Sequence, residues 1–138
     1  MSDSTGARPL YDQLGGETEV RALVDRFYDA MDRLPEAASV RAMHPRNLQS
    51  SRDKLFEFLS GWLGGPPLYI QKRGHPRLRA RHMPFAIGTP EAAAWMLCMA
   101  EALEGLPPEV PQLTREVLFS QLGQVASFMR NQPGDSPG

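Results

Sequence analysis

The chain has 138 residues, of which 41% are hydrophobic and 22% charged, and its formal net charge is −1. This length suits one domain with a buried core, and the balanced charge argues against a general nucleic-acid or membrane-surface binder. The one cysteine, Cys98, excludes an internal disulfide and a cysteine-based zinc or iron–sulfur site. No apolar run approaches the roughly 18–20 residues of a membrane span. No secretory leader is evident either, so we expect a cytoplasmic protein.

The first quarter of the chain predicts two helices. Residues 1–8 are small and polar, which indicates a flexible leader. A short helix is expected over 9–14, where Gly15 and Gly16 would end it. A longer helix is expected over 17–33, because apolar residues recur there at the spacing of one buried stripe. That stripe consists of Val20, Leu23, Val24, Phe27, Tyr28 and Met31.

The middle of the chain predicts another long helix after an irregular segment. Residues 34–49 contain prolines without periodicity and are expected to be irregular. Ser50 or Ser51 is a suitable N-cap for the helix that follows, which the Gly-Gly-Pro-Pro sequence over 64–67 would end. The broad apolar face of this helix consists of Leu55, Phe56, Phe58, Leu59, Trp62 and Leu63.

A loop over 68–74 is then expected to lead into a short helix over 76–82. Thr89-Pro90-Glu91 is a strong start signal, with an N-cap, a proline and an acidic first turn. The helix that it opens should end at Gly105. Its apolar residues at helical spacing are Ala92, Trp95, Met96, Met99 and Leu103.

A last helix is expected over 109–130, followed by a disordered tail over 131–138 that is rich in proline, glycine and aspartate. We find no alternating strand pattern, internal repeat or linker, so the sequence predicts an all-α fold with one domain over 9–130. The residues expected to face inward from the last helix are Val110, Leu113, Val117, Leu118, Leu122, Val125 and Phe128.

His82 is the most distinctive candidate for a functional residue. It falls in the last turn of the short predicted helix, just before Pro84. There its Nδ1–H can donate to a backbone carbonyl such as that of Leu78, which fixes the tautomer and leaves Nε2 available to a metal. A histidine on a helix is more often structural or exposed, and that interpretation stays open. A neutral imidazole on one axial face is nevertheless how globins and peroxidases hold haem iron.

The residues around His82 are strongly basic. The glycine and proline beside His75 place it in a loop or at a helix start, so we expect it at the edge of a pocket rather than on a metal. Most basic runs are a solvated face of the protein. The alternative is that one or two arginines pair with haem propionates, since guanidinium matches carboxylate geometry. The run consists of Lys72, Arg73, Arg77, Arg79 and Arg81.

Tyr28 and Trp95 are large aromatic residues with a polar group, and both lie on inner stripes. Core packing is the ordinary interpretation, yet a buried O–H or N–H still needs a partner. In a core that holds an oxygen-containing ligand, these groups would be its hydrogen-bond donors. Signatures of phosphate-binding loops, serine hydrolases, zinc proteases and EF-hands are absent. Pattern alone therefore predicts a small helical domain with one candidate metal ligand.

With these residues laid out, the chain closely resembles a group II truncated haemoglobin from about Tyr11 to Met129. Trp95 follows the longest matching motif at the family spacing. The matching motifs are Tyr11-Asp12-x-Leu14-Gly15-Gly16, Arg26-Phe27-Tyr28, Trp62-Leu63-Gly64-Gly65-Pro66, and the most specific one, Gly74-His75-Pro76-Arg77-Leu78-Arg79-Ala80-Arg81-His82-Met83-Pro84-Phe85.

The resemblance implies a two-over-two helical sandwich around haem b, with His82 as the proximal iron ligand. Tyr28 and Trp95 would be distal donors, and His44 a third distal polar group that titrates; these three are the candidate catalytic residues. Ser51 stands where many globins have a distal histidine, which makes a bis-histidine iron less expected, although His44 leaves that question open. We expect Lys54 and one of the arginines to pair with the haem propionates. The other expected haem contacts, taken with Lys54 and these arginines, are Lys54, Leu55, Phe58, Tyr69, His75, Arg77, Arg79, Arg81 and Phe85.

The family resemblance also implies a function, with alternatives. Members bind dioxygen, carbon monoxide and often nitric oxide, and several distal donors favour chemistry on bound oxygen over bulk transport. We therefore expect peroxidase-like or nitric oxide dioxygenase chemistry, driven by an external reductase. One alternative is a haem-based sensor or partner-binding module without turnover, and another is a haem-free helical protein. No nucleic-acid or membrane partner is expected, and a homodimer is compatible with the sequence.

Overall fold

The structure is a computed structural model that describes residues 8–131, apart from the side chain of Arg79. Within this range the chain forms helices and no strand, which confirms the predicted all-α class. The elements in order are α1 (Leu10–Leu14), α2 (Glu17–Arg33), the 3-10 helix η2 (Pro35–Ala37), α3 (Ala38–Ala42), α4 (Gln49–Trp62), α5 (Leu68–Arg73), α6 (Leu78–His82), α7 (Thr89–Glu104) and α8 (Gln112–Phe128).

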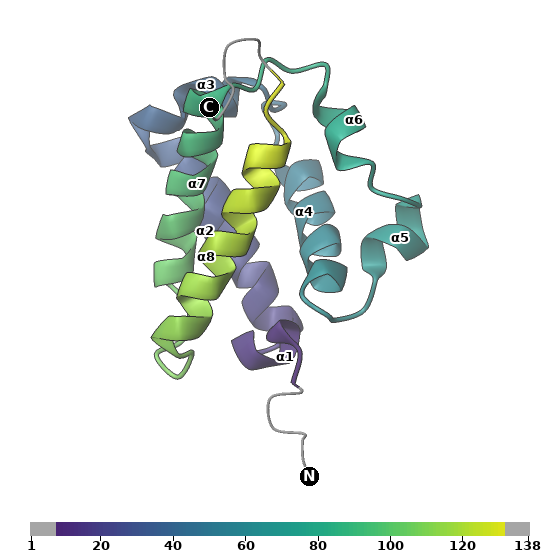
Figure 1. The fold of residues 1–138 in the computed structure, drawn as a ribbon, viewed down its shortest axis with the longest axis vertical. Coiled ribbons are helices and arrows are strands. Elements are labelled where there is room, and N and C mark those ends of the chain that lie inside the picture. The colour runs from purple at the N-terminus through teal and green to yellow at the C-terminus, as the bar shows by residue number, and fades with distance from the viewer. Residues whose placement is uncertain (1–7, 132–138) are drawn as a thin grey trace.

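The four long helices form two layers, as the two-over-two expectation requires. Helix α2 pairs with α4, α7 pairs with α8, and the closest packing between the layers is that of α2 on α7 (Figure 1). The short helices α5 and α6 lie to one side of these layers, beyond α4 in this view. None of the helices over 8–131 combines the length and apolar character that crossing a bilayer requires.

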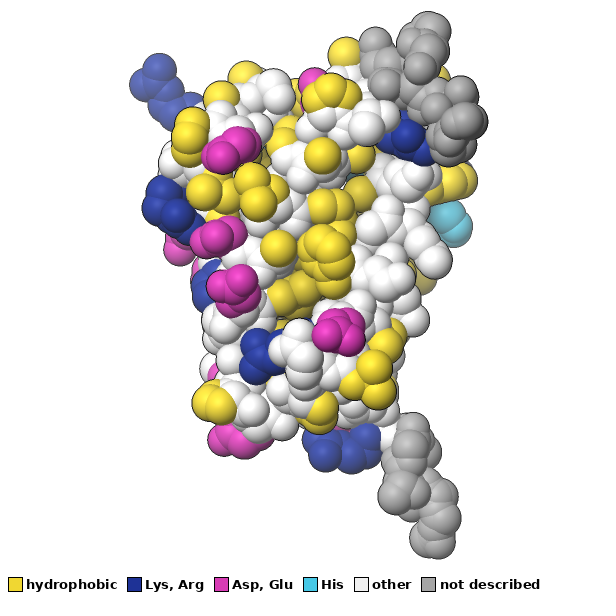
Figure 2. Space-filling view, turned by 60° about the vertical axis from the view of Figure 1, so that its left-hand side comes forward, with side chains coloured by type: hydrophobic (Ala, Val, Ile, Leu, Met, Phe, Trp, Pro, Cys, Tyr) yellow, Lys and Arg dark blue, Asp and Glu magenta, His cyan; other side chains and the backbone are white. Residues whose placement is uncertain are grey.

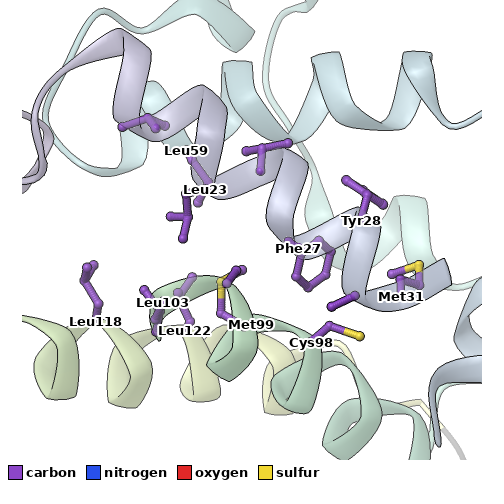
Figure 3. Close-up of a cluster of buried hydrophobic side chains, with 14 of the residues drawn as sticks. Leu23, Phe27, Tyr28, Met31, Leu59, Cys98, Met99, Leu103, Leu118 and Leu122 are labelled. Atoms are coloured by element: carbon purple, nitrogen blue, oxygen red, sulfur yellow. The ribbon is translucent and has the colours of Figure 1, made fainter. Parts of the chain in front are cut away.

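The predicted stripe of α2 forms the centre of the core. All six of its residues are buried, and Phe27 is completely shielded from solvent. In Figure 3, Leu23 and Phe27 point toward the layer that carries Cys98 and Met99 of α7. Burial of one large apolar side chain stabilises the fold by roughly 1.5–3 kcal/mol. The regular spacing of this stripe therefore determines how the two layers meet.

Ion pairs join α2 to α4 along the edge of that core. The Arg52 guanidinium donates to Asp25 Oδ1 at 3.0 Å and to Asp29 Oδ1 at 2.9 Å. Arg21 donates to Asp53 Oδ1 at 3.0 Å in a more exposed pair. Because Arg52 is well shielded and has two partners, it contributes more than an isolated surface pair would.

Two of the family motifs meet at the start of the fold. The Tyr11 N–H donates to Leu63 O at 2.9 Å, and the Tyr11 ring lies against Gly65. A Cβ atom at Gly65 would come within 2.5 Å of that ring, so only glycine fits there. The contact ties the first helix to the end of α4.

Two segments that we predicted as irregular or loop are helical, so those predictions are wrong. Residues 34–49 contain η2 and α3, and the predicted loop over 68–74 contains α5. Helices of three to six residues are too short to show an apolar period in the sequence. Helix α5 is instead held by Glu57, a buried carboxylate that accepts hydrogen bonds from Arg73 Nε at 2.6 Å and Lys72 Nζ at 3.1 Å.

Helix starts also differ from the prediction. Helix α4 begins at Gln49, whose N–H donates to the Asn47 side chain at 2.9 Å, so neither Ser50 nor Ser51 is the cap. The N-cap of α7 is Gly88 rather than Thr89, and its N–H donates to the Glu91 carboxylate at 2.8 Å. Each observed N-cap thus lies one to three residues before the N-cap that the sequence predicted.

Helix α8 is shorter than the predicted 109–130 and is rotated about its axis relative to our prediction. It packs on α7 through Leu118 and Leu122, whereas Leu113, Val117 and Phe128 are exposed rather than inward-facing. Figure 2 shows apolar side chains gathered in the middle of one face, flanked by acidic and basic side chains. The apolar residues of α8 therefore do not all lie on its buried face, and their presence alone was not enough to predict that face.

Both ends of the described range make hydrogen bonds. The Arg8 guanidinium donates to Asp12 O at 2.8 Å, and the Asn131 N–H donates to Ile87 O at 2.8 Å. Residues 1–7 and 132–138, which make up the rest of the predicted leader and tail, lie outside the described residues.

Candidate functional site

A pocket of about 500 Å³ lies between the two layers and the segment that carries α6, within the usual size range for small-molecule sites. Helices α2, α4, α6, α7 and α8 all contribute to its wall. Most of the residues that we predicted from the sequence line this pocket. They are Tyr28, His44, Lys54, Leu55, Phe58, Tyr69, Arg81, His82, Phe85 and Trp95.

Two predicted haem contacts, His75 and Arg77, are not brought to the pocket wall. His75 is exposed, and its Nδ1 accepts a hydrogen bond from the Arg77 N–H at 3.0 Å. Arg77, directly before α6, has a φ of 49°, which is a left-handed conformation outside the helix. The side chain of Arg79 lies outside the described part of the structure. The roles of these residues stay predictions.

Several lining residues were missed as site residues. The inward-facing pattern of the last helix pointed to Leu122 and Val125, but it did not show which cavity they would face. Met43 and Ile87 lie in segments without periodicity, so no sequence signal marked them. The missed residues are Val40, Met43, Pro45, Leu59, Leu78, Ile87, Glu91, Ala92, Leu122, Val125, Ala126 and Met129.

His82 has the geometry of an oriented ligand. Its Nδ1 lies 2.7 Å from Leu78 O, one helical turn earlier, which confirms the predicted hydrogen bond. Because a carbonyl can only accept, Nδ1 carries the proton and Nε2 keeps its lone pair. The ring is half-buried on the pocket wall, so this lone pair can coordinate a metal held in the pocket.

Tyr28 and Trp95 are positioned by one buried ring between them. The Phe27 ring makes edge contacts with both, at centroid distances of 4.9 Å to Tyr28 and 5.0 Å to Trp95. The structure shows no hydrogen bond from the Tyr28 hydroxyl or the Trp95 indole N–H to any described residue. Burial raises the pKa of Tyr28 far above its usual range, so its phenol remains a neutral donor.

His44 lies beside Tyr28 at a ring-centroid distance of 5.7 Å. Its Nδ1 lies 2.9 Å from Val40 O, which places the proton on Nδ1. Burial lowers the pKa of His44, and the nearby charges of Arg41 and His82 lower it further, although the Val40 hydrogen bond opposes them. Neutral His44 therefore offers Nε2 as an acceptor, and it becomes a second donor only when protonated.

Arg41 holds the corner that carries His44. Its guanidinium donates to Asp32 Oδ1 at 2.5 Å, to Pro45 O at 2.9 Å and to Arg46 O at 2.8 Å. These bonds tie the corner after α3 to the end of α2. The position of His44 next to Tyr28 is thus fixed from outside the pocket.

The pocket fits a metal that brings its own equatorial ligands. No group of three or more His, Cys, Asp or Glu side chains over 8–131 could hold a bare metal ion. A porphyrin needs only the one imidazole, and its faces suit the apolar walls formed by Leu55, Phe58 and Phe85. Lys54 and Arg81, both exposed, stand at this wall as partners for two carboxylates. The residues present therefore fit haem.

The chain belongs to the bacterial-like globin family, whose model matches residues 9–131. It is 41% identical to the group 2 truncated hemoglobin YjbI of Bacillus subtilis over 119 residues, 85% of each chain. It superposes on the group II 2-on-2 hemoglobin of Agrobacterium tumefaciens with a TM-score of 0.87 at 43% identity, covering 96% and 99% of the two chains. A truncated oxygen-avid haemoglobin from Bacillus subtilis gives 0.80 at 37% identity, covering 90% and 100%. These relatives confirm the group II truncated haemoglobin resemblance.

Because the pKa of His44 is lower in the fold than in the unfolded chain, acid should destabilise the fold through this residue. Well above pH 6.5, which is about the usual pKa of histidine, His44 is neutral in both the folded and the unfolded chain. As the pH falls below about 6.5, His44 takes up a proton in the unfolded chain but not in the folded one. This loss is at most about 1.4 kcal/mol per pH unit. We expect His44→Gln to unfold in urea with a shallower loss of stability between pH 6.5 and 5.5 than the wild type, measured without haem.

The same replacement at the exposed His75 controls for the loss of one imidazole. Parallel pH dependences for the wild type and His44→Gln would show that His44 is not a buried neutral base.

Proposed function

We propose that this protein holds haem b through His82 and binds dioxygen and other diatomic ligands beside Tyr28 and Trp95. One observation carries the proposal. An imidazole with an available Nε2 shares a pocket with a hydroxyl and an indole N–H that make no hydrogen bond to the described residues. Membership of the globin family supports haem as the group that completes this site.

Haem, when bound, would supply an iron that takes diatomic molecules and exchanges single electrons. The chain's contribution on the proximal side is the fixed His82 ring. The hydrogen bond to Leu78 O sets its tautomer and increases the basicity of Nε2. A ring held in this way needs no reorientation when the ligand bond forms.

On the distal side, Tyr28 and Trp95 would donate hydrogen bonds to an oxygen atom that gains negative charge. Hydrogen bonds to charged acceptors are worth about 1.5–3 kcal/mol each. Neutral His44, beside Tyr28, can accept from a water at Nε2, which leaves the one Tyr28 O–H proton for the bound ligand. Two donors in an apolar pocket favour slow release of dioxygen, and the oxygen-avid character of the Bacillus subtilis relative supports this inference.

The first prediction concerns haem itself. The purified protein should show a Soret band that shifts on reduction and on addition of carbon monoxide, and His82→Ala should lose or alter it because the axial imidazole is gone. His75→Ala, at an exposed position outside the pocket, is the matched control and should keep the wild-type spectrum. A folded protein that takes up no haem would refute the proposal and favour the haem-free alternative.

The second prediction concerns the donors. Tyr28→Phe and Trp95→Phe should each release dioxygen faster by at least about tenfold, since each loses one hydrogen bond to a charged acceptor. Stopped-flow displacement of dioxygen by carbon monoxide measures these rates. Tyr11→Phe, at a tyrosine that lies against Gly65 and outside the pocket lining, is the matched control. Release rates that equal the wild type would remove Tyr28 and Trp95 from the ligand site.

We further propose that slow release serves redox chemistry, with conversion of nitric oxide to nitrate or peroxidase-like turnover driven by an external reductase in the cytoplasm. The oxygenated protein should consume nitric oxide repeatedly when a reductase is present, and Tyr28→Phe should lower the turnover. Tight ligand binding without turnover would favour the alternative, a haem-based sensor or partner-binding module.

A further inference from the structure

Asn131, which follows α8, hydrogen-bonds to the segment that joins α6 to α7. Its N–H donates to Ile87 O at 2.8 Å, and the Ile87 N–H donates back to Asn131 Oδ1 at 3.0 Å. Asn131 Nδ2 donates to Phe85 O at 2.9 Å and to His82 O at 3.3 Å. The end of α8 is thereby joined to both ends of segment 82–87.

This segment has little else to hold it. Helix α6 is five residues long, which is too short to be stable by itself, and it packs little against the other helices. Figure 1 shows α6 at the side of the molecule, followed by an extended stretch that leads to α7. His82 is the last residue of α6, and its carbonyl accepts a hydrogen bond from the Phe85 N–H at 3.0 Å, within the segment itself. Asn131 bonds to this carbonyl.

The network requires an amide at position 131. The Ile87 N–H donates to the amide oxygen, and the carbonyls of His82 and Phe85 accept from the amide nitrogen, so the two ends of the amide cannot be exchanged. Aspartate would keep the acceptor but set a negative oxygen against two carbonyls. Leucine, of similar shape, would lose the three side-chain hydrogen bonds to segment 82–87.

We propose that Asn131 is a positioning residue for His82: it fixes segment 82–87 to the end of α8 and so holds the imidazole at its place on the pocket wall. The inference rests on the proposed function, because it treats His82 as the iron ligand. The Leu78 carbonyl orients the ring within α6, whereas Asn131 locates α6 relative to the body of the protein.

The test compares Asn131→Leu and Asn131→Asp with the wild type in the full chain. Both should lose haem to a scavenging apoprotein at least about tenfold faster, since two or three hydrogen bonds are lost. In the reduced protein the iron–histidine stretching band should shift or broaden, which a general loss of stability would not cause. Without haem, the Ile87 amide should exchange faster with solvent.

Asn47→Ala is the matched control, because it removes an asparagine side-chain hydrogen bond at the start of α4, away from this segment. It should leave the iron–histidine band unchanged and haem loss within about twofold of the wild type. An unchanged band and rate in both Asn131 variants, or an equal effect of Asn47→Ala, would overturn the proposal. If the wild type takes up no haem, the proposed function fails. The Ile87 amide exchange and the His82 ring nitrogen shifts then decide the Asn131 proposal: changes in the variants support it and unchanged values overturn it.

Discussion

The packing of Phe27 between Tyr28 and Trp95 is the constraint on which the site depends. Phe27 is completely buried where α2 crosses α7, and it touches an aromatic residue from each layer. The same contact that joins the layers therefore sets the separation of the two polar groups on the pocket wall. A close-packed core transmits small displacements, so a change at Phe27 would move both groups at once.

The pocket itself is apolar, and the charges around it are largely committed to structural roles. Glu57 holds Lys72 and Arg73, Arg41 holds the corner of His44, and Arg52 joins α2 to α4. Such pairs fix the helices that enclose the cavity, whose wall also carries Lys54, Arg81 and Glu91. His44 and His82, the two histidines of that wall, each hold Nδ1 against a backbone carbonyl, so both leave Nε2 available to a ligand.

The sequence predicted those parts of the molecule that depend on periodicity or on a specific motif. The stripe of α2 and the Nδ1 hydrogen bond of His82 follow from spacing within one helix, so both could be derived without coordinates. The short helices α3 and α5 carry too few residues for a period. The rotation of α8 and the role of Asn131 depend on partners distant in the chain, and no local pattern reports them. The hydrogen bond from Arg73 to the Glu57 carboxylate was not predicted for the same reason.

The position of α8 in the chain also bears on how the protein is made. Leu122 and Val125 of α8 close one wall of the pocket, and Asn131 after it fastens the segment that ends α6. Ala126 of α8 also lies on this wall, Met129 follows the end of α8, and the other wall residues precede α8 in the chain. On the ribosome, which releases the chain from the N-terminus onward, the packing of α2 on α4 and on α7 can form while this wall is still missing. The complete pocket exists only after α8 and Asn131 have emerged, so a cofactor that needs every wall cannot be enclosed before that point.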